Sequence, residues 1–196
     1  MILRCYRPGD GFMLADALND SYEHLVRFIP WSRRVTSDDE GEQRALDYRT
    51  RFLQDWDYNL AVVSPDDTRF LGNTDLRPEQ SEQQSGASLG SAEIGMWIRA
   101  DAAHGGLGTH VLSSLLYWGF SAWPFERLVW KCDVDNRASM RVAKKCWMRW
   151  AGVVEKDHMD GCGNLRDSHC FEALRSEWQT GYRQKSQHVC GRNSGY

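Results

Sequence analysis

The sequence predicts an α/β or α+β fold built around one mixed β-sheet. The first observation behind this prediction is the order of elements: a strand, several helices, several strands, and then strand, helix, strand, helix and strands. The second is a length of 196 residues without a repeat or a linker, which favours a single domain. The third is an apolar content of 41%, enough to bury a core and to argue against overall disorder.

The first half of the chain combines helical and extended patterns. Asp10 follows a Pro-Gly turn and is a candidate N-cap, and Ser37–Glu40 has the spacing of a capping box. Period-two alternation marks the strands, and apolar residues at helical spacing mark the helices. In order, the prediction is a strand at Ile2–Arg7, a helix after Asp10, a helical segment at Ser21–Ile29, a helix after Ser37, and strands at Tyr58–Val63, Arg69–Leu76 and Glu93–Ile98.

The second half alternates strands and helices. A helix is predicted at Leu107–Ala122, and Asn136 begins another helix that ends near Cys146. From Gln179 the chain has three basic residues, no acidic residue and little apolar content, which predicts a mobile tail after a domain of residues 1–178. The predicted strands of this half are Arg127–Val134, Ala151–Glu155 and His169–Ala173.

One stretch, Ala102–Phe125, has twenty-four residues without Asp, Glu, Lys or Arg, in a chain that is 26% charged. A run of this length raises the question of a membrane span. Pro124, four glycines, two histidines and three serines interrupt the run too often for a helix in hydrocarbon, so we expect no membrane span. The helix Leu107–Ala122 is amphipathic instead. Its predicted apolar stripe consists of Val111, Leu112, Leu115, Leu116, Gly119, Phe120 and Trp123.

A glycine-rich loop, His104–Thr109, follows a strand and opens this helix. Glycines let backbone amides turn toward one point, and a helix N-terminus adds donors and a partial positive charge. The loop can therefore hold a phosphate without Lys or Arg, with a flexible connector as the alternative. A P-loop would require Gly-Lys-Ser/Thr, which the sequence lacks. A dinucleotide loop would require a third glycine where Val111 stands, although Asp133 or Asp135 could supply its acid, so a nucleotide-dependent oxidoreductase is a weaker alternative.

Several segments together resemble the GNAT superfamily of N-acetyltransferases, and more narrowly its RimJ/RimL-type branch. Glu93–Ile98, the glycine loop with its helix, and Cys132–Ser139 carry the resemblance. Arg4–Asp10 resembles the opening of that branch, and His24–Trp31 resembles its substrate-side helices. The resemblance extends over residues 2–178.

The resemblance implies a mixed, mostly antiparallel central sheet flanked by helices, with a splayed strand pair forming an acetyl-CoA cleft. It implies an enzyme that uses acetyl-CoA, without a metal, to acetylate a primary amine, above all a protein or peptide N-terminal α-amine. A small-molecule amine such as an antibiotic or a polyamine is an alternative acceptor. A non-catalytic acyl-CoA-binding or sensing module is an alternative function. The family often forms dimers, so a homodimer is a further expectation.

Acetyl transfer needs a base for the amine, donors for the oxyanion and an acid for the thiolate. Glu93 is the candidate base, acting through a water, and Ser139 is the candidate acid. Two alternatives stay open, because Glu93 could pair with an arginine and Asn136 could serve only as a helix N-cap. Gly95 would ease a close approach of the backbone, or would serve packing alone.

The resemblance also assigns binding roles. It places the acceptor near Trp31, Glu93 and Trp97, and lets amides near Trp97 and Ile98 face the thioester carbonyl. It assigns the cofactor to Trp97, Ile98, Arg99, His104, Gly105, Gly106, Leu107, Gly108, Thr109, Asn136 and Ser139.

The sequence departs from the family pattern at five positions. Ala103 and His104 stand where the family usually has Arg or Gln and then Gly. Trp147 and Met148 replace a Gly-Phe pair after the second helix, and Ala143 stands where many members carry a catalytic Tyr. These changes concern cofactor affinity rather than the fold.

Charge and the N-terminal sequence argue against other classes. A net charge of −3 provides no basic field for nucleic acid and no polybasic patch for a membrane. Arg4 and Arg7 stand where a signal peptide needs its apolar core, and the six scattered cysteines fit reduced thiols in a cytoplasmic protein.

Two histidines and two cysteines in the second half of the chain raise the alternative of a zinc site. His158, Cys162, His169 and Cys170 are candidate ligands. His169 and Cys170 are adjacent on a predicted strand and so point to opposite faces, which leads us to expect no metal site.

Overall fold

The structure, a computed structural model, describes residues 1–79, 90–160 and 163–180. Cys162 and most of the predicted tail lie outside the described residues. The elements in chain order are β1 (Ile2–Cys5), α1 (Gly11–Asp20), α2 (Tyr22–Leu25), α3 (Asp38–Leu53), β2 (Leu60–Val63), β3 (Phe70–Pro78), β4 (Ser91–Ile98), the 3-10 turn η1 (Ala100–Ala102), α4 (Leu107–Ala122), β5 (Arg127–Asp133), α5 (Arg137–Lys145), β6 (Arg149–Met159) and β7 (Leu165–Leu174).

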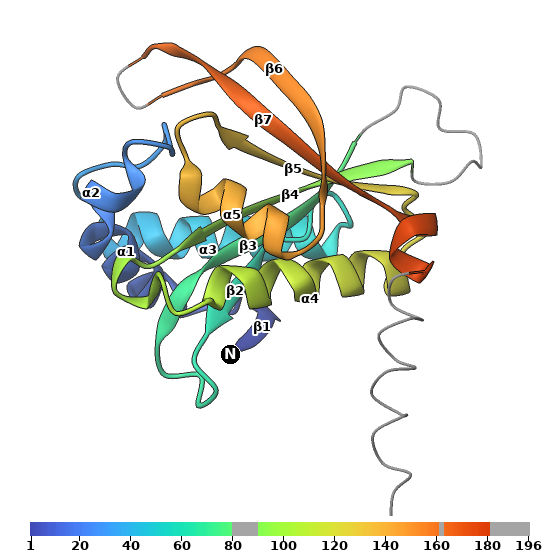
Figure 1. The fold of residues 1–196 in the computed structure, drawn as a ribbon. Coiled ribbons are helices and arrows are strands. Elements are labelled where there is room, and N and C mark those ends of the chain that lie inside the picture. Colours follow the sequence, from blue (N-terminus) through green and yellow to red (C-terminus); the bar gives the residue numbers. More distant parts are fainter. Residues whose placement is uncertain (80–89, 161–162, 181–196) are drawn as a thin grey trace, which may run out of the picture.

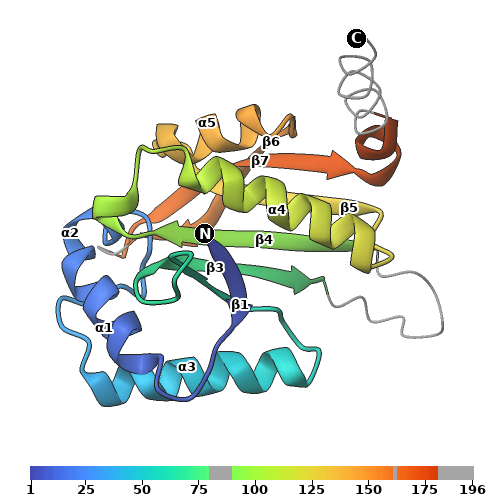
Figure 2. The same cartoon turned by 90° about the horizontal axis from the view of Figure 1, so that it is seen from below.

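The seven strands form one sheet in the order β1-β2-β3-β4-β5-β7-β6 (Figure 1). Neighbouring strands are antiparallel, except that β4 and β5 are parallel. Helices α1 and α3 cover one face of the sheet, and α4 and α5 cover the other (Figure 2). The predicted mixed, mostly antiparallel sheet flanked by helices is confirmed.

The parallel strands β4 and β5 separate along their length. Ser91–Ile94 pairs with Arg127–Trp130. Beyond that point the described residues Gly95–Ile98 and Lys131–Asp133 no longer pair with each other. The sheet therefore contains the splayed strand pair that the family resemblance implied.

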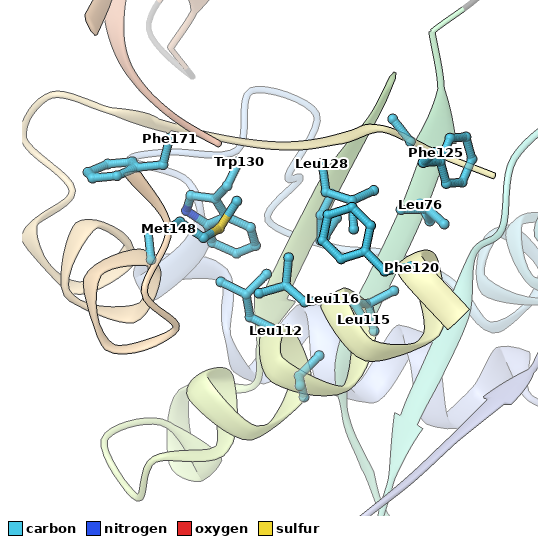
Figure 3. Close-up of a cluster of buried hydrophobic side chains, with 14 of the residues drawn as sticks. Leu76, Leu112, Leu115, Leu116, Phe120, Phe125, Leu128, Trp130, Met148 and Phe171 are labelled. Carbon is cyan, nitrogen blue, oxygen red and sulfur yellow. The ribbon is translucent and has the colours of Figure 1, made fainter. Parts of the chain in front are cut away.

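The larger core lies between the sheet and α4 (Figure 3). Leu112, Leu115 and Phe120 of α4 pack with Leu128 and Trp130 of β5. The predicted apolar stripe of α4 is buried from Val111 to Phe120, and Trp123 is half-buried. The charge-free stretch thus belongs to a packed helix. Among the described residues, no helix is both long enough and apolar enough to cross a membrane.

A second core lies on the opposite face, against α1 and α3. Leu14 and Leu18 of α1 pack there with Tyr6, Phe70 and Trp97. Successive residues of a strand point to opposite faces, so along β4 every second residue joins the α4 core and Trp97 joins the α1 core. This alternation decides which side chains of β4 meet the site described below.

The ends of the first helices confirm one prediction and contradict another. The capping box from Ser37 to Glu40 is formed at the start of α3, as predicted. The side chain of Asp10 does not cap α1. Its carboxylate accepts hydrogen bonds from the Arg4 guanidinium at 2.7 and 2.8 Å and from the Arg7 amide at 2.7 Å, so it is already engaged.

Two further predictions need correction. The helical segment expected at Ser21–Ile29 is an α-helix only over Tyr22–Leu25. Leu25 is anchored in the core, and Pro30 disfavours helix in the residue before it, so the chain turns instead of continuing. The strand predicted to end at Glu155 continues to Met159, because a register shift between Val154 and His158 lets the hairpin resume its pairing.

Candidate functional site

A cavity of about 300 Å³ lies where β4 and β5 separate. Ile94–Ile98 lines it from β4, and Trp130–Asp133 lines it from β5. His24, Leu25, Phe28 and Ile29 contribute from α2 and the turn after it. The remaining lining residues are Ala103, His104, Gly108, Asn136, Ala138, Ser139 and Val142.

The structure brings many of the predicted site residues to this cavity and leaves others away from it. Trp31 is 42% exposed, and its ring lies 4.7 Å from the Arg44 guanidinium. Arg99 is buried, and its guanidinium forms ion pairs with Asp16 at 2.7 Å and with Asp20. Neither Trp31 nor Arg99 is among the described residues that line the cavity. Those that do are Trp97, Ile98, His104, Gly108, Asn136 and Ser139, with Gly105, Gly106, Leu107 and Thr109 in the adjoining loop and first turn.

The glycine loop gives α4 an open N-terminus. Gly106 is the N-cap residue and has a φ of 85°, in the left-handed region that favours glycine. No described side chain caps this helix, and the amides of Thr109 and His110 donate to the Gly106 carbonyl at 3.0 and 3.1 Å. The amides of Leu107 and Gly108 precede the first intrahelical bonds and are the donors left for a ligand. A Cβ atom added at Gly105 or Gly106 would meet nothing within 4 Å. The loop therefore has donors, a partial positive charge and space for an anion.

At two positions where the sequence departs from the family pattern, the backbone keeps a conformation that favours glycine. His104 has a φ of 68° and Trp147 a φ of 61°, both in the left-handed region. The family usually has glycine at both positions, and the chain keeps the conformation despite the side chain. Met148 is buried and takes its place in the core, where the family has Phe.

Ser139 and Asn136 are fixed by hydrogen bonds at the start of α5. The side chain of Asn136 accepts from the Ser139 amide at 3.0 Å, so Asn136 caps the helix as the alternative interpretation predicted. The indole N–H of Trp130 donates to Ser139 Oγ at 3.0 Å. Because Ser139 Oγ accepts this bond, its hydroxyl proton remains a donor, and the Cys132 thiol is one group that it faces. Burial raises the pKa of the adjoining Cys132 thiol, against an opposing hydrogen bond from Ser139.

Glu93 lies on the face of β4 that points away from α4. Its carboxylate pairs with Arg77 Nη2 at 2.8 Å and with Lys131 Nζ at 3.5 Å. Lys131 lines the cavity and also pairs with Asp157 at 3.1 Å. Glu93 is not among the described lining residues, so it adjoins the cavity through Lys131. The arginine partner considered from the sequence is present.

Gly95 permits a close approach between two strands. A Cβ atom there would lie 2.6 Å from Asp75 Oδ2, because the two residues face each other across β3 and β4. The carboxylate of Asp75 is 15% exposed and lies 2.9 Å from Arg77 Nε. Burial raises the pKa of Asp75 to about 6, and the nearby Arg77 opposes that rise.

The lining residues that the sequence-based prediction did not assign to the site include three that can carry a charge: His24, Lys131 and Asp133. Alternation along β5 from Cys132 could have placed Lys131 and Asp133 on one face, had the strand register been known. Asp133 pairs with Arg166 at 3.0 Å and with His158 at 3.4 Å. Burial alone would raise the pKa of Asp133, but the bonds from Arg166 and the Asp135 amide outweigh it and lower that pKa.

The candidate zinc ligands do not converge in the described part of the chain. His158 Nδ1 lies 3.2 Å from Ser168 Oγ, and His169 accepts from the Trp150 indole at 3.3 Å. Within residues 1–79, 90–160 and 163–180, no three His, Cys, Asp or Glu residues form a metal-binding group.

Solved structures of acetyltransferases share this fold. The microcin self-immunity acetyltransferase MccE, in complex with acetyl-CoA and AMP, is 18% identical, with a TM-score of 0.77 over 88% of this chain and 91% of that chain. The ribosomal α-N-protein acetyltransferase RimL, in complex with coenzyme A, is 18% identical, with a TM-score of 0.76 over 88% and 92%. RimJ from Mycobacterium smegmatis, in complex with CoA-disulfide, is 19% identical, with a TM-score of 0.77 over 89% and 82%.

At the level of sequence, no curated protein matches the chain. The model of the acetyltransferase (GNAT) domain family matches residues 1–149. This match covers most of the chain, including β4, the glycine loop, α4, β5 and α5. The chain therefore belongs to the GNAT acetyltransferase family.

Proposed function

We propose that this protein transfers the acetyl group of acetyl-CoA to a primary amine, with a protein or peptide N-terminus as the acceptor. The observation that carries the proposal is the cavity between the separated ends of β4 and β5, which reaches the N-terminus of α4. The cavity thus joins a place for a thioester arm to a place for a phosphate.

The residues around this cavity fit acetyl-CoA, which supplies an acetyl thioester when bound. Backbone groups of Gly95–Ile98 and Lys131–Asp133 lack a partner between the two strands, and such groups bond readily to the amides of a pantetheine arm. The open N-terminus of α4 suits the diphosphate. Ile94, Met96 and Val142 provide an apolar wall.

Three roles follow for the residues of this chain. We assign oxyanion stabilisation to amides near Trp97 and Ile98. We assign protonation of the leaving thiolate to Ser139, whose oxygen is already held by the Trp130 indole. We assign deprotonation of the amine to Glu93 through a water, beside the Lys131 ammonium that separates it from the cavity.

The base role of Glu93 is tested by Glu93→Gln. We expect kcat/KM to fall by about a hundredfold or more, because a general base contributes about 10²–10⁴-fold, and to fall most at low pH, where free amine is scarce. Arg77→Gln is the matched control, since it removes the 2.8 Å partner of the same carboxylate and keeps the carboxylate. Equal losses in both variants with an unchanged pH–rate profile would reduce Glu93 to a member of an ion pair.

The acceptor is tested with a panel of amines and a thiol-release assay. RimL is an α-N-protein acetyltransferase, which supports a protein N-terminus, whereas MccE is a self-immunity acetyltransferase for a microcin, which keeps a small molecule in the panel. We expect N-terminal peptides to give higher kcat/KM than polyamines or amine antibiotics. A small amine that exceeds every peptide by about tenfold would replace the proposed acceptor.

A non-catalytic acyl-CoA-binding module is the second candidate, favoured by Ala103, His104 and the missing Tyr at Ala143. The enzyme and the binding module predict different results when two assays are combined. Calorimetry shows whether acetyl-CoA binds, and the panel shows whether thiol is released faster than by hydrolysis. Binding without amine-dependent release would favour the module.

We also propose a homodimer through the outer strand β6. This strand ends the sheet, and Trp150, Val153 and Met159 expose apolar side chains along it. Long apolar edge strands favour pairing with another chain. Light scattering should give a dimer for the wild type and a monomer for Val153→Lys. A cytoplasmic location is proposed from the free thiols of Cys5, Cys132 and Cys170.

A further inference from the structure

Two histidines line the cavity, and one of them belongs to the glycine loop for which we propose a phosphate. His104 lies in the loop before α4, and His24 lies in α2, so different elements bring them to the same cavity. Both are exposed and both line the cavity, which places them at its opening. Their neighbourhood has an unusual composition, because residues 102–125 contain no Lys, Arg, Asp or Glu.

The other ionisable groups that line the cavity have partners. On β5, Lys131 pairs with Asp157 at 3.1 Å and Asp133 pairs with Arg166 at 3.0 Å. Cys132, also on β5, keeps its proton because burial raises the pKa of the thiol. The β5 wall is therefore neutralised.

The charged groups on the elements next to the two histidines also have contacts, which are ion pairs or, for Arg27, an aromatic ring. In η1, Asp101 binds Arg69 at 2.6 Å and Arg99 at 3.2 Å. On the α2 side, Glu23 pairs with Arg34 at 3.4 Å, and the Arg27 guanidinium lies 5.2 Å from the Phe28 ring centre. These pairs leave imidazole as the titratable group best placed to meet an anion at the opening.

The imidazole of His24 is affected by that of His104. Partial burial lowers the pKa of His24, and the charge of His104 lowers it further. When the cavity holds no anion, the ring of His24 therefore binds a proton less readily than a free imidazole does. A diphosphate between the two would reverse this effect, because a nearby negative charge favours the protonated form of both rings.

We propose that His104 and His24 together bind the diphosphate of CoA in protonated form, so that cofactor binding takes up protons from solution. This inference rests on the proposed use of acetyl-CoA and adds a specific recognition device to it. His104 then supplies the charge that Ala103 removes from the family pattern. Affinity follows the linkage between protonation and binding, and we expect it to be about threefold to tenfold weaker at pH 8 than at pH 6.

Isothermal titration calorimetry with 3′-dephospho-CoA tests the proposal directly. The 3′-phosphate of CoA itself titrates near pH 6 and would add its own protons, whereas the diphosphate does not titrate in this range. Titrations at pH 7 in two buffers of different ionisation enthalpy give the number of protons taken up. We expect about half a proton to one proton for the wild type.

Three variants separate the proposed pair from other histidines. His24→Gln and His104→Gln should each lower the proton uptake, and the double variant should abolish it. His110→Gln is the control, because His110 is exposed on α4, the helix that follows His104, and is not among the described residues that line the cavity. His104→Gly removes the imidazole at a φ of 68° and relieves backbone strain, so a loss of uptake there does not arise from misfolding.

The outcomes distinguish the inference from the function on which it rests. If neither acetyl-CoA nor dephospho-CoA binds the wild type, the proposed function fails. If the ligands bind without proton uptake, or with uptake that persists in the double variant, the function stands and the histidine pair is overturned.

Discussion

The two faces of the sheet at β4 are built by different interactions. The α4 face is closed by apolar side chains from a stretch that carries no charge. The opposite face, across β3, β4 and β5, carries Asp75, Arg77, Glu93 and Lys131, joined by ion pairs of 2.9, 2.8 and 3.5 Å. Burial of apolar area stabilises a fold far more than partly exposed ion pairs do. The comparison therefore teaches that the α4 face contributes buried apolar area, whereas the part of the opposite face outside the α1 core arranges charge beside the cavity.

The strongest test of this difference is Leu112→Ala on the α4 face. Leu112 is fully buried in the α4 core, so we expect the free energy of unfolding to fall by about 3 kcal/mol, from lost burial and the cavity left behind. Urea denaturation measures the change. Leu53→Ala is the control, because Leu53 at the end of α3 is 64% exposed. Similar losses at both positions would contradict the assignment of stability to the α4 core.

Asp75→Asn probes the charged face, and its expected effect has the opposite sign. The pKa of Asp75 is raised to about 6, so the folded state binds a proton more tightly than the unfolded state. Stability therefore falls as pH rises from about 4 through about 6, and the uncharged Asn avoids that loss. After allowance for the lost Arg77 pair, we expect about 1–2 kcal/mol of stabilisation at pH 7 and little change at pH 4.

Denaturation curves at both pH values measure this effect. Asp47→Asn, on the exposed surface of α3, should change stability little at either pH. A destabilisation at pH 7 by Asp75→Asn would mean that the Arg77–Asp75 pair outweighs the cost of burying the carboxylate. The charged face would then stabilise the fold as the apolar face does.

The smallest expected effect concerns the backbone rather than either face. Trp147 is 80% exposed at a φ of 61°. Glycine adopts this conformation without strain, although it adds entropy to the unfolded chain, so we expect Trp147→Gly to stabilise by about 0.5–1 kcal/mol. A shift in the thermal midpoint measures it. Destabilisation would show that contacts of the indole exceed the strain.

The contrast between the two faces also explains what could be predicted from the sequence. The bounds of α4 and the capping box of α3 depend on local patterns, and both were predicted correctly. The glycine loop was likewise located from local spacing, and Gly106 has the left-handed φ that such a loop requires. Patterns of this kind are complete within a few residues of the chain.

The parts that were missed depend on contacts between distant segments. The partners of Glu93 come from two different strands, so they follow from register and not from local sequence. Asp10 had the spacing of a cap, but its carboxylate is taken by Arg4, which lies in β1. His24 lines the cavity because its neighbour Leu25 anchors a four-residue helix in the core. A helix this short is not predicted by hydrophobic periodicity.

The separation of β4 and β5 has a consequence for how the molecule is assembled. Strands β1–β4 come from residues 2–98 and strands β5–β7 from residues 127–174, so each set is continuous in the sequence. Four residue pairs between Ser91–Ile94 and Arg127–Trp130 join the two sets within the sheet, and α4 links them in the chain. The cavity thus lies at the boundary between two halves of the sheet, each of which comes from one continuous part of the sequence. A substitution far from the site that rotates one half against the other will change the width of the cleft without altering any residue that lines it.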